Sequence, residues 1–192
     1  MSMYTGTQDE VLYNNVGVAT QLNTFTAESN LQATYPPVII PAGFFLNPSS
    51  IGKALKVKAW GQLGTTGAPT FTWSLRLLTS TTWSAGGLLL GSTAALTGGT
   101  TQTLAPWTLE ADISLKALSI GGASTIQTQG EVRSPLGLAS PFSGTIPNNN
   151  TAITLATFDN SVTYYLFLSI ACGTSAAANL AQLTQLKVYG EN

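Results

Sequence analysis

The stretch Pro106–Ile120, PWTLEADISLKALSI, decides the fold class of this chain. Its apolar side chains share one parity, and the polar side chains occupy the other. The apolar set is Trp107, Leu109, Ala111, Ile113, Leu115 and Ala117. Alternation with a period of two predicts a long β-strand with one buried face and one solvated face, because successive side chains of a strand point to opposite sides. Such a strand belongs to a sheet that packs against a second layer.

Further strands are predicted on both sides of this stretch. Residues 53–63 and 69–77 alternate in the same way across a Gly-rich turn, so we expect them to form a hairpin. Residues 124–133 are expected to pair antiparallel with residues 106–120. The remaining strand candidates are residues 38–46, 87–90, 151–158, 162–172 and 181–189.

This pattern, with about eight strands and no predicted helix longer than a turn, indicates an all-β fold. We expect an antiparallel β-sandwich, jelly-roll-like in its topology, over residues 35–192. Residues 1–34 carry scattered apolar residues without a period and precede Pro36-Pro37, so they are predicted to form an extended N-terminal arm. The arm is either a disordered tail or a segment that lies on a neighbouring subunit, and its apolar residues favour the second.

The composition limits the choice of partners. Only 8% of the 192 residues are charged, and the formal net charge is −1. A near-zero net charge gives no long-range attraction for nucleic acid or for anionic lipid, so neither nucleic acid nor a membrane is an expected partner. A surface with few ions is typical of a subunit that other subunits partly cover, or of a neutral extracellular β-domain. We favour the assembly.

Few residues are candidates for catalysis or metal binding. The chain has no histidine, which excludes a Ser–His or Cys–His nucleophile pair and imidazole-ligated zinc. The single cysteine, Cys172, excludes an internal disulfide, and its place on the apolar parity of a strand predicts a buried side chain. Asn148–Asn150 and Asp159 offer fewer carboxylates than calcium sites usually have. We expect no metal and no cofactor.

Glu110 and Asp112 lie on one face of the predicted strand, with side chains about 7 Å apart, which is within the range of a glycosidase carboxylate pair. Ion pairing on a solvated face explains them better, because basic residues lie on the same face of this strand and on other predicted strands. These residues are Lys56, Lys58, Arg76 and Lys116. The protein is therefore not expected to be an enzyme, and no residue is assigned a catalytic role.

The four tryptophans divide into two kinds. Trp73 and Trp107 have inward parity and are predicted core residues. Trp60 has outward parity and Trp83 lies in a loop, which suits either a sugar-binding platform or a subunit interface. We favour an interface. The candidate interface residues are Trp60, Trp83, Val11, Leu12, Val16 and Phe25.

Four segments of the chain resemble tailed-bacteriophage structural proteins with a jelly-roll domain. They are GKALKVKAWG (52–61), GAPTFTWSLRL (67–77), APWTLEADI (105–113) and LTQLKVY (183–189). The resemblance extends over about residues 38–190 and is to capsid decoration or minor capsid proteins. It implies a virion component that binds and stabilises the assembled shell, with the major capsid protein as partner. It also implies a homo-oligomer, most often a trimer.

The N-terminal sequence MSMYTGTQDE lacks the charged and apolar regions of a signal peptide, which fits synthesis in a host bacterial cytoplasm followed by incorporation into a virion. The alternative function is a tail or fibre receptor-binding module, or a carbohydrate-binding β-sandwich. A sugar-binding protein should show Trp60 or Trp83 exposed in a groove with polar neighbours. A decoration protein should instead show apolar or uncharged patches that face the shell.

Overall fold

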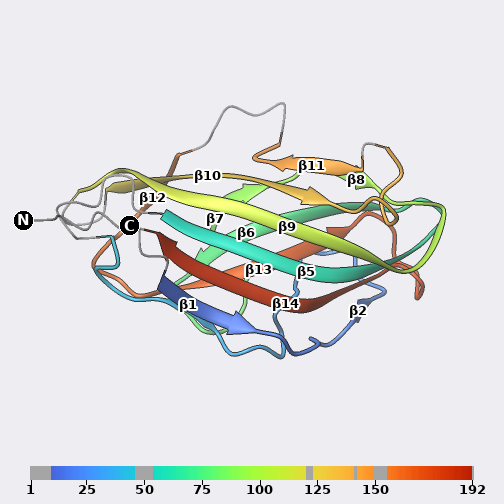
Figure 1. Cartoon of the computed structure of the whole chain (residues 1–192), viewed down its shortest axis with the longest axis horizontal. Coiled ribbons are helices and arrows are strands. Elements are labelled where there is room, and N and C mark those ends of the chain that lie inside the picture. The colour runs from blue at the N-terminus through green and yellow to red at the C-terminus, as the bar shows by residue number, and fades with distance from the viewer. Residues whose placement is uncertain (1–9, 46–53, 120–122, 141, 149–154, 192) are drawn as a thin grey trace, which may run out of the picture.

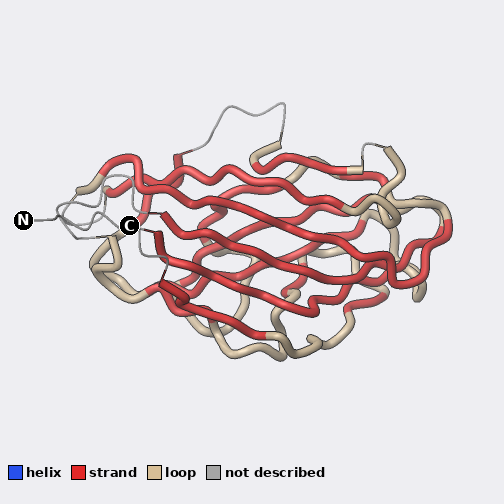
Figure 2. Tube along the Cα trace, viewed as in Figure 1, coloured by secondary structure: helices blue, strands red, loops and turns tan. Residues whose placement is uncertain are grey.

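The computed structural model describes residues 10–45, 54–119, 123–140, 142–148 and 155–191. These residues form two antiparallel β-sheets packed face to face (Figures 1 and 2). The described part of the chain contains no helix long and apolar enough to cross a membrane. The expected all-β antiparallel sandwich is confirmed.

The larger sheet faces the viewer in Figure 1 and has the strand order β1-β14-β5-β9-β10-β11, with β2 beside β14 and β12 beside β10. Its strands are β1 (Glu10–Asn15), β2 (Leu22–Asn23), β5 (Ala54–Thr66), β9 (Thr101–Ala117), β10 (Ser124–Arg133), β11 (Ser143–Ile146), β12 (Leu155–Phe158) and β14 (Leu180–Glu191).

The smaller sheet lies behind it and has the order β3-β13-β6-β7, with β4 beside β13 and β8 beside β6. Its strands are β3 (Ser29–Asn30), β4 (Val38–Ile40), β6 (Thr70–Leu78), β7 (Leu88–Ser92), β8 (Leu96–Thr97) and β13 (Tyr164–Cys172). The described residues thus form fourteen strands, where about eight were expected. The difference comes mainly from short edge pieces, such as the two-residue strands β2, β3 and β8.

Strand β9 forms the centre of the larger sheet and pairs with β5 on one side and β10 on the other, as expected for β10. The predicted alternation is confirmed from Trp107 to Leu115, whose inward side chains are at most 2% exposed, whereas Ala117 at the end of the strand is exposed. Trp107 meets Trp73 of β6 across the core, with ring centroids 5.8 Å apart. Cys172 is buried as predicted, at 1% exposure.

The expected hairpin between residues 53–63 and 69–77 is wrong. Strand β5 belongs to the larger sheet and β6 to the smaller one, so the connection crosses from one layer to the other. Gly67 and Ala68 both have a positive φ, 67° and 53°, within this connection. Both strands bury their inward faces in the same core from opposite sides, which a hairpin within one sheet could not do. A corner and a hairpin use the same turn residues, so the sequence did not distinguish them.

The N-terminal segment also differs from the expectation. Residues 10–34 do not extend from the sandwich: β1 pairs with β14, β2 pairs with β14, and β3 pairs with β13. Ala19 and Leu31 are 2% and 1% exposed within the core. This part of the expected arm therefore completes the edges of both sheets of its own chain, while residues 1–9 lie outside the described residues. Of the strand expected at 38–46, only Val38–Ile40 is a strand, and residue 46 lies outside the described residues.

Candidate functional site: the Trp83 cleft

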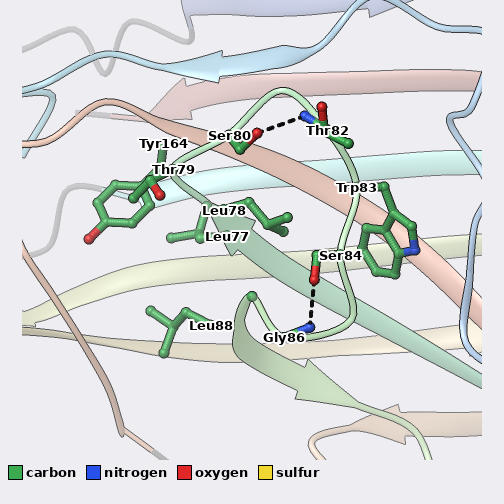
Figure 3. A pocket seen from close by; sticks show the side chains of 11 residues that line it. Leu77, Leu78, Thr79, Ser80, Thr82, Trp83, Ser84, Gly86, Leu88 and Tyr164 are labelled. Atoms are coloured by element: carbon green, nitrogen blue, oxygen red, sulfur yellow. Dashed lines mark hydrogen bonds between the residues drawn. The ribbon is translucent and has the colours of Figure 1, made fainter.

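An open cleft of about 580 Å³ lies where β6 ends and β7 begins. We call it the Trp83 cleft. Leu77 and Leu78, the last residues of β6, form its floor, and the loop of residues 79–87 runs round it before the chain enters β7 at Leu88 (Figure 3). Tyr164, the first residue of β13, closes the side opposite Trp83.

The loop owes its shape to local hydrogen bonds, drawn in Figure 3. The Ser80 hydroxyl oxygen accepts from the Thr82 backbone N–H at 3.1 Å, and the Ser84 hydroxyl oxygen accepts from the Gly86 N–H at 3.2 Å. Serine and threonine in loops favour such turns because their hydroxyls satisfy nearby backbone groups. Gly87 completes the loop, and a Cβ at this position would lie 2.5 Å from a Leu78 methyl carbon and 3.0 Å from the Leu77 carbonyl oxygen, so a larger residue would require Leu78 or the loop to move.

The two aromatic side chains of the cleft are held from outside it. The Trp83 indole packs edge-on against Phe167 of β13, with ring centroids 5.6 Å apart. The Tyr164 ring packs against Phe158 at 6.1 Å, and its hydroxyl oxygen accepts from the Asp159 N–H at 3.2 Å. Both rings are therefore partly ordered before any ligand binds, which lowers the entropic cost of binding.

The cleft offers only uncharged groups to a ligand. The eleven residues that line it are leucine, threonine, serine, tryptophan, glycine and tyrosine. Ligand sites of proteins typically combine apolar and aromatic walls with a few polar groups in a volume of about 300–1,000 Å³. The chemistry of the Trp83 cleft suits a neutral ligand that has both apolar surface and hydrogen-bonding oxygens.

An ion-pair network supports the end of the loop. Arg76 of β6 donates from Nε and Nη2 to the two Glu28 carboxylate oxygens, both at 2.7 Å, and from Nη1 to the Gly87 carbonyl oxygen at 2.8 Å. The Ser169 hydroxyl donates to Glu28 Oε1 at 2.6 Å. Burial acts to raise the pKa of Glu28, but the hydrogen bonds from Arg76 and Ser169 and the Arg76 charge outweigh it, so this pKa lies below its ordinary value.

This network joins three parts of the chain that are far apart in sequence. Glu28 belongs to the N-terminal segment, Arg76 to β6, and Ser169 to β13. The side chains of Arg76 and Glu28 are only 14% and 18% exposed. The N-terminal segment therefore contributes to the support of the Trp83 cleft, although it does not line it.

Glu110 and Asp112 lie on the outer face of the larger sheet, away from this cleft. As predicted, they pair with lysines of β5: Lys58 Nζ lies 3.6 Å from Glu110 Oε1, and Lys56 Nζ lies 4.0 Å from Asp112 Oδ1. Of the other two predicted partners, Arg76 lies in the other sheet, and Lys116 lies on β9 itself, the strand that carries Glu110 and Asp112.

A smaller hollow of about 210 Å³ lies beside Glu110, between Thr108, Glu131 and Arg133. Arg133 Nη2 donates to Glu131 Oε2 at 2.6 Å, and this hydrogen bond lowers the pKa of Glu131. Among the described residues, no three acidic, histidine or cysteine side chains come close enough together to hold a metal ion. Of the Asn148–Asn150 loop, residues 149 and 150 lie outside the described residues.

The structure separates the two tryptophans that were expected at an interface. Trp83 lies in the cleft, at its edge (Figure 3). Trp60 lies on the outer face of the larger sheet, half-buried, with Lys187 Nζ 5.8 Å from the centre of its ring. Trp83, and not Trp60, therefore lies at a groove with polar neighbours, although its ring is half-buried against Phe167 and not exposed as expected.

The four N-terminal candidate interface residues differ in their exposure to solvent. Val11 and Val16 are 58% and 69% exposed, whereas Leu12 and Phe25 pack against the core of their own chain. The six candidate interface residues therefore do not form one surface. Sequence reasoning missed the leucine floor and Tyr164, which reach the cleft only through the packing of β6 beside β13.

A comparison with protein-family models gives no match, and neither does a comparison with curated proteins. Among solved structures, the chain is similar to the CBM2 module of the evolved Dit of Lactobacillus casei BL23 phage J-1, with 13% identity, a TM-score of 0.37 and 97% of each chain covered. It is also similar to a protein of unknown function from Shewanella oneidensis MR-1, with 12% identity, a TM-score of 0.39, and 96% of this chain and 77% of that chain covered. We draw no functional conclusion from either likeness, because both TM-scores are below 0.5.

Proposed function

We propose that this chain is a carbohydrate-binding β-sandwich module of the tail or fibre receptor-binding kind, and that the Trp83 cleft is its binding site. The observation that carries the proposal is the position of Trp83 in an open cleft of about 580 Å³ with serine and threonine neighbours. The sequence argument expected such a groove with polar neighbours in a sugar-binding protein, and the half-buried Trp83 ring lines it at the edge.

The chemistry of the cleft fits a sugar better than other ligand classes. A sugar ring has an apolar C–H face that packs on an aromatic side chain, and its oxygens accept and donate hydrogen bonds at the edge. The cleft supplies Trp83 and Tyr164 as aromatic walls and hydroxyl groups from the loop of residues 79–87. Its uncharged lining argues against a phosphate, a carboxylate or a cationic ligand.

The alternative function as a capsid decoration protein rests on the resemblance of the sequence to phage structural proteins. In the described part of the chain, the candidate interface residues do not gather into one apolar patch that a shell could cover. We therefore favour the carbohydrate-binding module. The same resemblance suggests that the protein is a component of a virion, and we include this location in the proposal. The homo-oligomer and the absence of enzyme activity stay predictions.

The proposal is tested by the binding of the purified protein to an array of neutral and charged glycans. The wild-type protein is compared with Trp83→Ala and with Trp60→Ala, a matched control that removes the outward tryptophan of the other sheet. We expect binding to neutral glycans, its loss in Trp83→Ala and its retention in Trp60→Ala. No binding to any glycan, or equal binding by wild type and Trp83→Ala, would contradict the proposal.

A further inference from the structure

We infer that the Trp83 cleft selects neutral sugars that carry an acetyl group, such as an N-acetylhexosamine; this inference rests on the proposed function. The cleft is divided into an apolar and a polar part. Leu77 and Leu78 form the floor, Leu88 lies beside them, and the hydroxyls of Ser80 and Ser84 lie in the surrounding loop (Figure 3). An acetyl group has the same two parts, a methyl group and a carbonyl oxygen.

The loop has hydrogens to donate. Ser80 and Ser84 each accept a backbone N–H with the hydroxyl oxygen, at 3.1 and 3.2 Å. A serine hydroxyl has one hydrogen to donate in addition to its acceptor sites, so both hydroxyl hydrogens remain for an acceptor on the ligand. A carbonyl oxygen is such an acceptor.

Two acceptors of the same loop are already in use. The Gly87 carbonyl oxygen accepts from Arg76 Nη1 at 2.8 Å, and the Ser84 carbonyl oxygen accepts from the Gly87 N–H at 3.3 Å. The backbone N–H groups of Thr82, Gly86 and Gly87 are also used in these bonds, so among the bonded groups the hydrogens left to donate are those of the two serine hydroxyls. A carbonyl oxygen on the ligand suits these two hydroxyl hydrogens, because it only accepts and leaves no donor of its own unpaired.

The floor explains why the ligand should also carry a methyl group. Leu77 packs into the sandwich core and Leu78 is 6% exposed, so the apolar surface that a ligand can cover comes mainly from the half-buried Leu88 beside them. A sugar hydroxyl pressed on these leucines would lose its hydrogen bonds to water without replacement, which is unfavourable. A methyl group in the same place gains from the removal of apolar surface from water.

The inference is tested with matched sugars that differ only at C2, where one carries an acetamido group and the other a hydroxyl. Binding of N-acetylglucosamine is compared with that of glucose, and N-acetylgalactosamine with galactose, by nuclear magnetic resonance titration of the whole protein. We expect each acetylated sugar to bind about tenfold more tightly, the factor given by one buried methyl group and one hydrogen bond. In saturation-transfer spectra, the acetyl methyl protons should receive the strongest saturation.

Two variants separate the floor from its surroundings. Leu88→Thr places a hydroxyl beside the floor and should remove most of the preference for the acetylated sugar. Leu89→Thr is the matched control, because Leu89 is the next residue of β7, is 41% exposed and does not line the cleft, so it should keep the preference.

The possible failures are distinguishable. Equal binding of the acetylated and plain sugars, or equal preference in wild type and Leu88→Thr, would overturn the acetyl inference and leave the carbohydrate-binding function standing. If neither the sugars of this test nor the glycans of the array bind, both the inference and the proposed function are wrong.

Discussion

The change Glu28→Gln tests whether the N-terminal segment is an integral part of the fold. Glutamine keeps the shape of the side chain but removes the charge, so the paired hydrogen bonds from Arg76 and the one from Ser169 lose their charged acceptor. A hydrogen bond to a charged group contributes about 1.5–3 kcal/mol, and breaking a fully buried ion pair costs about 3–5 kcal/mol.

The side chains of Arg76 and Glu28 are 14% and 18% exposed, so solvent weakens this pair relative to a fully buried one. We expect Glu28→Gln to lower the free energy of unfolding by about 2 kcal/mol. For a chain of this size, this corresponds to a decrease in Tm of about 4–8 °C. The matched control is Glu131→Gln, whose partner Arg133 is 67% exposed, and it should cost at most about 0.5 kcal/mol.

The stabilisation by Glu28 depends on pH, and the direction of this dependence follows from the lowered pKa of its carboxyl group. Because the pKa of Glu28 in the folded protein lies below its ordinary value of 4.5, its stabilisation is complete above that value and is lost as the pH falls through the lowered pKa. Urea unfolding should therefore show a difference between wild type and Glu28→Gln that is constant near neutral pH and shrinks below pH 4.5. Equal effects of Glu28→Gln and Glu131→Gln, or a difference that does not change with pH, would refute this reasoning.

Three further predictions concern the rest of the sandwich. Gly61→Ala should destabilise the fold by about 3 kcal/mol in urea unfolding. The reason is that its Cβ would lie 2.1 Å from the Gln182 carbonyl oxygen and 2.4 Å from the Trp107 ring. A stability within about 0.5 kcal/mol of wild type would contradict the close packing of β5 on Trp107. Deletion of residues 1–34 should lower Tm, because β1 to β3 and their buried side chains would be lost. Deletion of an arm that lies outside the fold would not lower Tm. An unchanged Tm would show that the segment is dispensable. Cys172 should react with iodoacetamide only after unfolding, because burial raises the pKa of its thiol, and rapid labelling of the folded protein would contradict this.

Much of the core could be predicted from the sequence because the alternation of apolar and polar residues along a strand shows directly which side chains are buried. Along β9, burial on one face requires apolar residues at every second position, and the sequence shows this without interruption from Trp107 to Leu115. The same parity argument correctly placed Trp73 and Cys172 inside. It also placed Glu110 where a lysine of the neighbouring strand could reach it.

The parts that could not be predicted depend on contacts between distant residues. Strands β1 to β3 are short and half-buried at the edges of the sheets, so they leave no period in the sequence. The turn after β5 has the residues of a hairpin, and only the position of β6 in the second sheet shows that it is a corner. For the cleft, the sequence marked Trp83 as an unusual loop residue. It did not show that Tyr164, about 80 residues later, would lie opposite, because β13 reaches β6 only in the folded chain.

The central claim is that Trp83 lies at the binding site for a neutral sugar, and the indole N–H signals of the four tryptophans test it most directly. Trp73 and Trp107 are buried in the core, and Trp60 lies on the outer face of the other sheet, so the four signals report on separate places. In a ¹⁵N correlation spectrum recorded during titration with a bound glycan, the Trp83 signal should shift with the ligand concentration while the other three stay in place. A glycan that moves the Trp60 signal and leaves the Trp83 signal unchanged would contradict this account.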